Sequence, residues 1–215
     1  MRRWACAGAT SNDRSAPPPL MPELPEVETT RRHLVPHIVG RTIVEVVIHA
    51  GADRLAMTHA PRELEAELSG RRIEAVERYG KYLLASLDDG RTWVIHLRMS
   101  GQVLIADRGA DRPLHTHVVL SLDNDTEMWF VDPRTFGEVV VYDPANAAVE
   151  LPPIARLGVD PIAEDFPRAH LRQLVRATSQ TLKPFLLDQT KVAGIGKSIA
   201  KKIDEFLETG IISRL

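Results

Sequence analysis

Short strand-like segments dominate the chain between residues 42 and 143, and they constrain its fold more than any other feature. They read TIVEVVIH, RRIEAVERYG, KYLLASL, TWVIHLRM, GQVLIA, HTHVVLSL, EMWFVD and GEVVVYD. Such β-branched and aromatic residues favour strands, and the Asp-Asp-Gly and Asp-Asn-Asp sequences between them are typical of turns. Strands this short and this closely spaced predict an antiparallel sandwich or barrel.

Helical patterns lie on both sides of the strands. From Glu26 apolar residues recur at helical spacing up to a closing segment at residues 36–40, and PRELEAELSG predicts a second helix that ends at Gly70. Beyond residue 150, FPRAHLRQLVRATSQTLKPFLLDQTK and GKSIAKKIDEFLETG show the same spacing. We therefore expect an α+β fold, with a two-layer β-sandwich and flanking helices over residues 21–150 and a small helical domain over residues 151–215.

Composition excludes several classes of protein. No run of about eighteen apolar residues is present, which argues against a membrane helix, and the first twenty residues lack the apolar stretch of a secretory signal. We expect a cytoplasmic protein. The only cysteine, Cys6, lies in residues 1–20, which read as a disordered extension or a mistaken start upstream of Met21. The net charge of -2 excludes nothing, because a nucleic-acid-binding protein needs only one basic face.

The segment MPELPEVE can place a reactive amine at the start of the folded chain. If Met21 is the first residue and is removed, Pro22 carries a secondary α-amine, which is partly neutral at pH 7. Such an amine attacks an aldehyde-like carbon to form an imine, and the neighbouring Glu23 can move a proton. The alternative is that MPELPEVE only leads into a helix, with acidic residues at its positive end.

Two turns among the strands carry apolar residues beside arginine. They are MSGQV at residues 99–103 and DPRTFG at residues 132–137. Proteins that flip a base out of DNA insert such apolar side chains into the stack, while a cation meets phosphate or a base edge. The alternative places Met99 and Phe136 in the core and leaves Arg134 as a surface charge.

The motifs taken together resemble a known family. MPELPEVETTRRHLVPHIVGRTI, YGKYLL, HLRMSG, VDPRTFG, LGVDPI and LKPFLLDQTKVAGIG occur in the order of the formamidopyrimidine-DNA glycosylase and endonuclease eight family, over about residues 21–196. The resemblance implies a β-sandwich joined to a helical DNA-binding domain, with the lesion site in the cleft between them. It also implies that an amine displaces an oxidised purine at C1′ and that the resulting imine leads to strand cleavage.

The resemblance assigns roles residue by residue. It matches Pro22 to the imine-forming nucleophile, Glu23 to the acid that opens the sugar ring, and Glu26 to a supporting carboxylate. Lys81 matches a catalytic lysine that contacts the damaged strand. The expected DNA-binding residues are Met99, Arg134 and Phe136, which enter the duplex, together with His115, Lys183 and Lys197.

The chain departs from the family pattern after Gly196. Lys197 stands where the family usually has asparagine, and residues 194–215 instead resemble the helix-hairpin-helix of the DNA polymerase beta family. The sequence has no four-cysteine zinc finger, so we expect a truncated helical domain and no metal or other cofactor. AGIGKS is no phosphate-binding P-loop, because Lys191 occupies the position that requires the first glycine.

Two functions follow from these residues. The first is a monomeric, nucleoid-associated repair enzyme that removes oxidised purines from double-stranded DNA and cuts at abasic sites. The second is a damaged-DNA-binding module without catalysis, because Pro22 inside a longer chain is an inert amide. A fragment that does not fold is a third reading.

Overall fold

The computed structural model describes residues 21–49, 52, 55, 60–163 and 167–209, so the extension expected at residues 1–20 lies outside it. The helices are α1 (Leu24–Ile38), α2 (Pro61–Leu68), α3 (Ala147–Glu150), α4 (Pro152–Ala155), α5 (Arg168–Arg176), α6 (Leu182–Leu187) and α7 (Lys197–Thr209), with a 3-10 helix, η2, at Pro144–Asn146. The strands are β1 (Ile43–Ile48), β2 (Ile73–Tyr79), β3 (Tyr82–Leu87), β4 (Thr92–His96), β5 (Gln102–Asp107), β6 (Thr116–Leu122), β7 (Thr126–Val131) and β8 (Glu138–Tyr142).

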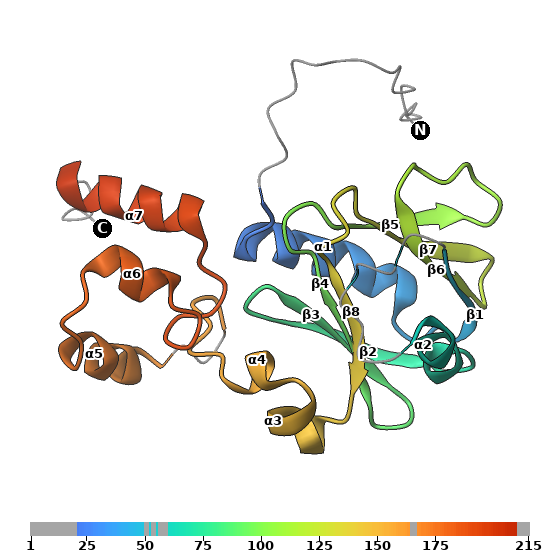
Figure 1. Ribbon diagram of the computed structural model, residues 1–215, viewed down its shortest axis with the longest axis horizontal. Coiled ribbons are helices and arrows are strands. Elements are labelled where there is room, and N and C mark those ends of the chain that lie inside the picture. The colour runs from blue at the N-terminus through green and yellow to red at the C-terminus, as the bar shows by residue number, and fades with distance from the viewer. Residues whose placement is uncertain (1–20, 50–51, 53–54, 56–59, 164–166, 210–215) are drawn as a thin grey trace, which may run out of the picture.

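The strands form two antiparallel four-stranded sheets, with the orders β1-β6-β7-β5 and β2-β3-β4-β8. Every hydrogen-bonded strand pair is antiparallel. Figure 1 shows the two sheets together on one side of the molecule, with α5, α6 and α7 grouped on the other. The α+β fold with an N-terminal β-sandwich, expected from the strand pattern, is confirmed.

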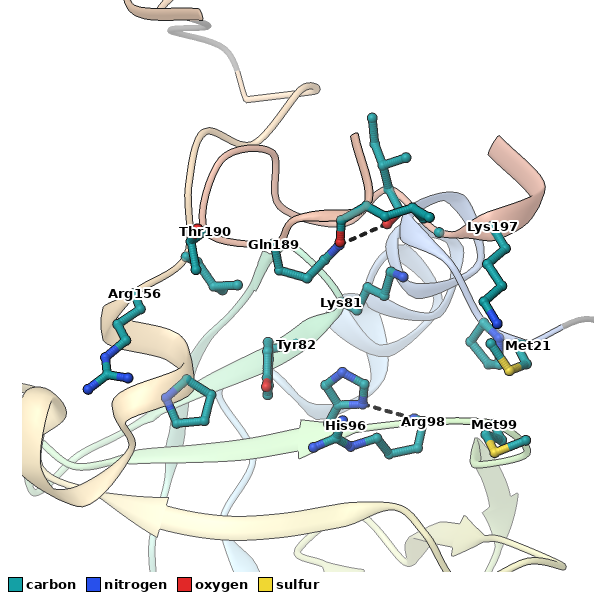
Figure 2. A pocket seen from close by; sticks show the side chains of 16 residues that line it. Met21, Lys81, Tyr82, His96, Arg98, Met99, Arg156, Gln189, Thr190 and Lys197 are labelled. Carbon is teal, nitrogen blue, oxygen red and sulfur yellow. Dashed lines mark hydrogen bonds between the residues drawn. The ribbon is translucent and has the colours of Figure 1, made fainter. Parts of the chain in front are cut away.

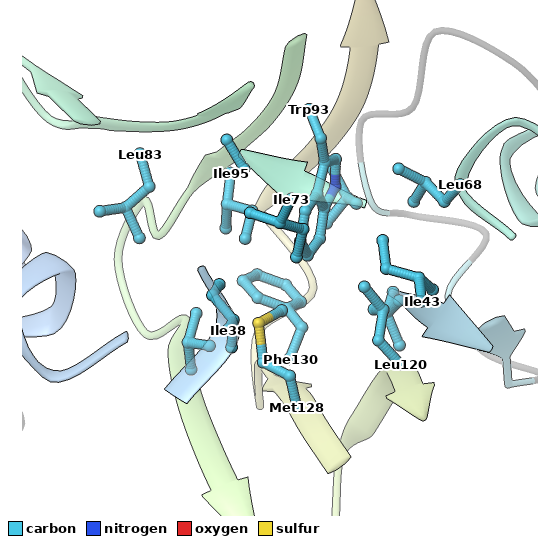
Figure 3. Packing of buried hydrophobic residues seen from close by; sticks show 14 of the residues in the cluster. Ile38, Ile43, Leu68, Ile73, Leu83, Trp93, Ile95, Leu120, Met128 and Phe130 are labelled. Carbon is cyan, nitrogen blue, oxygen red and sulfur yellow. The ribbon is translucent and has the colours of Figure 1, made fainter. Parts of the chain in front are cut away.

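The main core lies between the two sheets. Trp93 and Ile95 of β4 meet Met128 and Phe130 of β7 there, and Ile38 of α1 joins them (Figure 3). Trp93 and Phe130 are each only 1% exposed. Burial of a large apolar side chain stabilises a fold by roughly 1.5–3 kcal/mol, so this layer fixes the strands that carry the predicted site residues.

Helix α1 follows its amphipathic pattern to the last turn. Its buried residues are Leu24, Val27, Leu34 and Ile38, and Pro25 lies in the first turn, where a missing N–H costs no hydrogen bond. The helix continues through Pro36 and ends at Ile38, so the expected closing segment overlaps its last turn. This packing places the residues just before α1 beside the helical domain.

The chain leaves the sandwich through a short helical link. Leu151, between α3 and α4, and Ile154, in α4, pack against side chains of the sheet. These are Tyr82, Val94 and Val140. These side chains lie on the face of the β2-β3-β4-β8 sheet that points away from the main core. The predicted division near residue 150 falls within this link.

The helical domain has its own small core. Phe185 of α6, Val192 and Ile195 of the connecting loop, and Ala200 of α7 are buried together. The long segment expected to be helical divides into α5 and α6, with a break at residues 177–181. Within the described residues, no helix is long and apolar enough to cross a membrane.

A buried ion network joins the two domains. Arg78 of β2 donates to both oxygens of Asp160, at 2.6 and 3.0 Å, and also to Glu28 of α1 at 3.2 Å. Asp160 also accepts a hydrogen bond from the backbone N–H of Gly80 at 2.9 Å. Because breaking a buried pair leaves an uncompensated charge, this network holds the link against the turn that carries Lys81.

We predict that Glu28 makes folding sensitive to acid. Hydrogen bonds from Arg31 lower the pKa of Glu28 from 4.5 to about 2, and bonds from Arg32 and Arg78 act in the same direction. The folded-state pKa is therefore below the unfolded one, so this stabilisation is complete above pH 4.5 and is lost as the pH falls towards 2. Denaturant unfolding between pH 6 and pH 2 measures the effect.

Glu28→Gln should flatten this pH dependence. Glu74→Gln is the matched control, because the Glu74 side chain is 53% exposed and lies 3.9 Å from its partner Arg72. A pH dependence that is the same with Glu28→Gln as in the parent would contradict the assignment.

Candidate active site

The side chain of Glu23 caps the first turn of α7, although the two are far apart in sequence. Its Oε1 accepts a hydrogen bond from the N–H of Ser198 at 2.8 Å, and its Oε2 accepts from Gly196 and Ile199, both at 3.1 Å. Glu23 is only 5% exposed. The free N–H groups and the positive end of a helix stabilise a carboxylate, so α7 both fixes Glu23 and compensates its charge.

The loop before α7 approaches Glu23 so closely that it requires glycine. A Cβ at Gly196 would lie 2.3 Å from Cδ of Glu23, and one at Gly194 would lie 2.6 Å from Cδ1 of Leu24. Gly194 also has a φ of +91°, which side chains with a Cβ rarely adopt. The amide of Gln189 holds this loop, because it donates to Ile195 O at 2.9 Å and accepts from Gly194 N at 2.9 Å.

Glu26 supports Glu23 from within α1. Its Oε2 accepts the backbone N–H of Glu23 at 3.0 Å, as the third residue of a helix does in a capping box. Glu26 therefore fixes the main chain at Glu23, while α7 fixes the side chain. Pro22 therefore precedes a residue whose backbone and side chain are both fixed by hydrogen bonds.

A cavity of about 710 Å³ opens beside Pro22, between the sandwich and the helical domain. Figure 2 shows Lys197 extending towards Met21, with Lys81 on the same side of the opening and Arg98 and Met99 on the other side. Its lining residues are Met21, Pro22, Lys81, Tyr82, His96, Arg98, Met99, Pro153, Arg156, Leu157, Leu187, Gln189, Thr190, Ile195, Gly196 and Lys197.

The cavity is lined by cations. Lys81, Arg98, Arg156 and Lys197 line it, and none of the described residues that line it is a carboxylate. Burial lowers the pKa of Lys81 below its usual range, and the negative charge of Glu23 acts in the opposite direction. A concave surface lined by one sign of charge concentrates ligands of the other sign, so this cavity suits an anion such as a phosphate backbone.

His96 is an uncharged member of this cavity. Burial lowers the pKa of His96 to about 3, and the charges of Arg98 and Lys81 add to the effect. Its Nδ1 accepts the N–H of Arg98 at 2.9 Å, so the neutral ring carries its proton on Nε2. Sequence reasoning missed His96, although its place at the end of a strand, three residues before Met99, was a usable signal.

A further cavity, of about 290 Å³, also borders Pro22. Pro22 and Met99 line both cavities, and Glu26 and Ser100 line the second. Pro22 therefore borders both cavities, within reach of a ligand that occupies either one.

The structure brings some of the expected site residues together and leaves others apart. Pro22, Lys81, Met99 and Lys197 line the larger cavity, and Glu23 lies at its edge, bonded to lining residue Gly196. The remaining expected residues lie outside both cavities, and all are exposed: His115, Arg134, Phe136 and Lys183. Phe136 is 57% exposed, so the alternative that placed it in the core is wrong.

Three turns near these residues hold a strained backbone. Arg98, His115 and Thr135 have φ values of 51°, 67° and 55°, in the left-handed region that favours glycine. Such residues persist where the surrounding structure determines them, and they cluster at functional sites. Each lies at or next to a residue that the sequence had singled out.

Comparison with known proteins gives a consistent result. The formamidopyrimidine-DNA glycosylase N-terminal domain model matches residues 21–139. A formamidopyrimidine-DNA glycosylase of Stutzerimonas stutzeri is 40% identical over 200 residues, which cover 90% of this chain and 72% of that protein. One of Herpetosiphon aurantiacus is 42% identical and covers 84% of this chain, which spans 64% of the relative's length.

The chain is also similar to solved structures of a relative. Lactococcus lactis Fpg in complex with DNA that contains an abasic site has a TM-score of 0.73 and 33% identity, over 83% of this chain and 64% of that one. An inhibited form of that protein with DNA that contains N7-benzyl-Fapy-dG has a TM-score of 0.74, over 85% of this chain and 66% of that one.

We predict that Gly196→Ala releases Glu23 from α7, because the new Cβ would overlap the carboxylate. The amides of Ser198 and Ile199 should then exchange with solvent faster, and the free energy of unfolding should fall by about 1–3 kcal/mol, the usual cost of leaving buried polar groups unpaired. Amide hydrogen exchange followed by NMR measures the first effect and denaturant titration the second. Ser198→Ala is the control, since it keeps all three N–H donors; unchanged exchange in Gly196→Ala would contradict the capping role.

Proposed function

Because the chain belongs to the formamidopyrimidine-DNA glycosylase family, we propose that it is a base-excision repair enzyme. It removes oxidised purines from duplex DNA and cuts the strand at the abasic site that results. The observation that carries this proposal is the position of Pro22, which lines two cavities and lies next to a fixed carboxylate and near a set of cations. The relative from Lactococcus lactis was solved with abasic-site DNA, which supports the same class of ligand.

Pro22 is the nucleophile in this proposal. In a mature chain that begins at Pro22, its secondary amine attacks C1′ of the damaged nucleoside, and the base leaves with the electrons of the glycosidic bond. The proton of the attacking amine passes to Glu23 and from there to the ring oxygen, which opens the sugar as an iminium. The iminium acidifies the protons on C2′, so loss of one of them expels the 3′ phosphate.

Glu23 suits this proton transfer because hydrogen bonds fix its position before the reaction. Three N–H donors at the start of α7 fix its oxygens, and Glu26 fixes its backbone. A preorganised group needs no rearrangement at the moment of reaction, which is how enzymes gain much of their electrostatic stabilisation. An amine and a carboxylate suffice for every step, so the proposed reaction uses no metal or other cofactor.

The cations bind the DNA backbone in this proposal. Lys81 and Lys197 reach into the cavity from opposite domains, and Arg156 lines it from the link. Together they attract the phosphates next to the damaged nucleotide. We place the protein, as a monomer, with the chromosome in the bacterial cytoplasm, which fits the bacterial sources of its relatives.

The turns at residues 99–103 and 132–137 supply the wedge, by which we mean the side chains of Met99, Arg134 and Phe136 that enter the base stack. Met99 borders the active-site cavities, whereas Phe136 and Arg134 project into solvent from the turn after β7. An exposed phenylalanine beside an arginine suits insertion into a base stack, because it refills the space that the extruded base leaves. Both turns therefore serve base extrusion rather than bond cleavage.

We predict covalent trapping that depends on the amine of Pro22. Protein that begins at Pro22, mixed with duplex DNA containing an oxidised purine and with borohydride, should form a stable protein–DNA adduct, because borohydride reduces the imine. The matched control begins at Met21, so that Pro22 is an amide, and should form no adduct. Gel electrophoresis and intact mass measure both outcomes. Equal trapping by the Met21 form would rule out Pro22 as the nucleophile, and salt-dependent binding without cleavage by the Pro22 form would favour the non-catalytic module.

We predict that the wedge residues act in base extrusion, before any bond is cleaved. Met99→Ala combined with Phe136→Ala should lower excision of an oxidised purine by about tenfold or more, because unstacking a base costs a few kcal/mol that the wedge offsets. Cleavage at a preformed abasic site should fall much less. Single-turnover assays on the two substrates give the ratio. Leu114→Ala, at a residue that is 81% exposed in the same domain, is the control; equal losses on both substrates would contradict the wedge role.

A further inference from the structure

One buried contact joins the two wedge-bearing turns. The hydroxyl of Ser100, which follows Met99, donates to Oδ1 of Asp132 at 2.5 Å. Asp132 is 0% exposed and Ser100 is 6% exposed, so water does not compete for this contact. A hydrogen bond to a charged group is stronger than one between neutral groups, and burial strengthens it further.

The same carboxylate builds the turn that presents Arg134 and Phe136. Its Oδ1 accepts the N–H of Arg134 at 3.2 Å, and its Oδ2 accepts the N–H groups of Phe136 and Gly137 at 2.9 and 2.8 Å. Three backbone donors and one hydroxyl thus surround a single side chain. The path of residues 132–137 therefore depends on Asp132.

The backbone of Asp132 extends this network to the start of β6. Its N–H donates to the carbonyl of His115 at 3.0 Å, and Nε2 of His117 lies 2.9 Å from its carbonyl oxygen. The strained residues His115 and Thr135 are both held by this set of contacts, since the N–H of Thr135 also donates to Asp132 O.

Both turns end at a closely packed glycine. A Cβ at Gly137 would lie 2.4 Å from Cζ of Phe130, in the main core, and one at Gly101 would lie 2.6 Å from the carbonyl oxygen of Leu97. Close-packed interiors transmit displacements rather than absorb them. The hydrogen bond from Ser100 to Asp132 therefore joins two closely packed turns and offers a route by which a shift of the Met99 turn reaches the Phe136 turn.

We propose that Ser100 and Asp132 are positioning residues that make Met99, Arg134 and Phe136 enter DNA as one rigid unit. This rests on the proposed function, because a wedge needs a duplex to enter. With the contact intact, loss of one wedge residue disables the other, so Met99 and Phe136 act cooperatively in base extrusion. Without it, each side chain meets the stack separately and extrusion slows.

The test is Ser100→Ala, which removes the bridging hydroxyl and leaves the three backbone bonds of Asp132 in place. Stopped-flow fluorescence of 2-aminopurine, placed next to an oxidised purine in duplex DNA, reports extrusion of the base. We expect extrusion to slow by about tenfold, the effect of losing one hydrogen bond to a buried charge. Ser121→Ala is the matched control, because Ser121 is 4% exposed in β6 and lies outside both turns.

A double-mutant cycle separates positioning from a general loss of stability. Met99→Ala and Phe136→Ala, alone and together, are measured on the parent and again with Ser100→Ala. We expect strong coupling between the two substitutions in the parent and coupling near zero when Ser100 is also changed. Ser100→Thr keeps a hydroxyl and should restore most of the extrusion rate.

The outcomes separate the two proposals. If the parent protein neither extrudes nor excises the damaged base, the proposed function fails. If the parent is active but Ser100→Ala extrudes at the parent rate and keeps the coupling, the positioning role is overturned while the function stands. Slower extrusion with unchanged coupling in a variant that unfolds at the parent temperature would also overturn it.

Discussion

The hydrogen bonds between Glu23 and the first turn of α7 are the interaction on which the site depends. Three backbone donors of the helical domain close on one carboxylate of the sandwich, so the two domains meet at the residue next to Pro22. The cavity follows from that meeting, because one wall comes from each domain. A carboxylate can be buried here only while the N-terminus of α7 faces it. The geometry of the site therefore depends on the docking of the two domains.

Local patterns determined most of what could be predicted from the sequence. Strand composition and turn residues identified the sandwich, and helical spacing identified α1 and α7, because these signals act between near neighbours. The contact between Glu23 and Ser198 spans 175 positions, and no local pattern encodes it. His96 was missed for a related reason: its lowered pKa comes from burial and from the charges of Arg98 and Lys81, which only the folded chain brings together. The motif resemblance supplied Lys81 and Lys197, whose shared cavity the structure then revealed.

His115 and His96 lie in different environments. The sequence offered His115 as the phosphate-contacting histidine, and the structure places it on an exposed turn outside both described cavities. Its backbone lies in the left-handed region, and its carbonyl accepts a hydrogen bond from Asp132, which connects it to the turn at residues 132–137. Its predicted contact with phosphate stays a prediction. His96, by contrast, lines the cavity as a neutral ring whose proton position is fixed by the N–H of Arg98. A buried neutral ring can donate to a phosphate without repelling the lysine beside it.

The buried carboxylates Glu23 and Asp132 are compensated in the same way, and this explains why the cavity keeps its positive charge. Glu23 and Asp132 are both buried, and their hydrogen-bond donors are backbone N–H groups, joined at Asp132 by the hydroxyl of Ser100, rather than arginine or lysine. Elsewhere the fold does use cations for this purpose, as Arg78 does for Asp160. Because backbone amides compensate Glu23 and Asp132, Lys81, Arg156 and Lys197 form no ion pair with either carboxylate within the described residues, and they keep their charge for a ligand. This separation matters for the proposed reaction. A lysine paired with Glu23 would hold the carboxylate that is proposed to move the proton, and it would weaken the field that attracts phosphates.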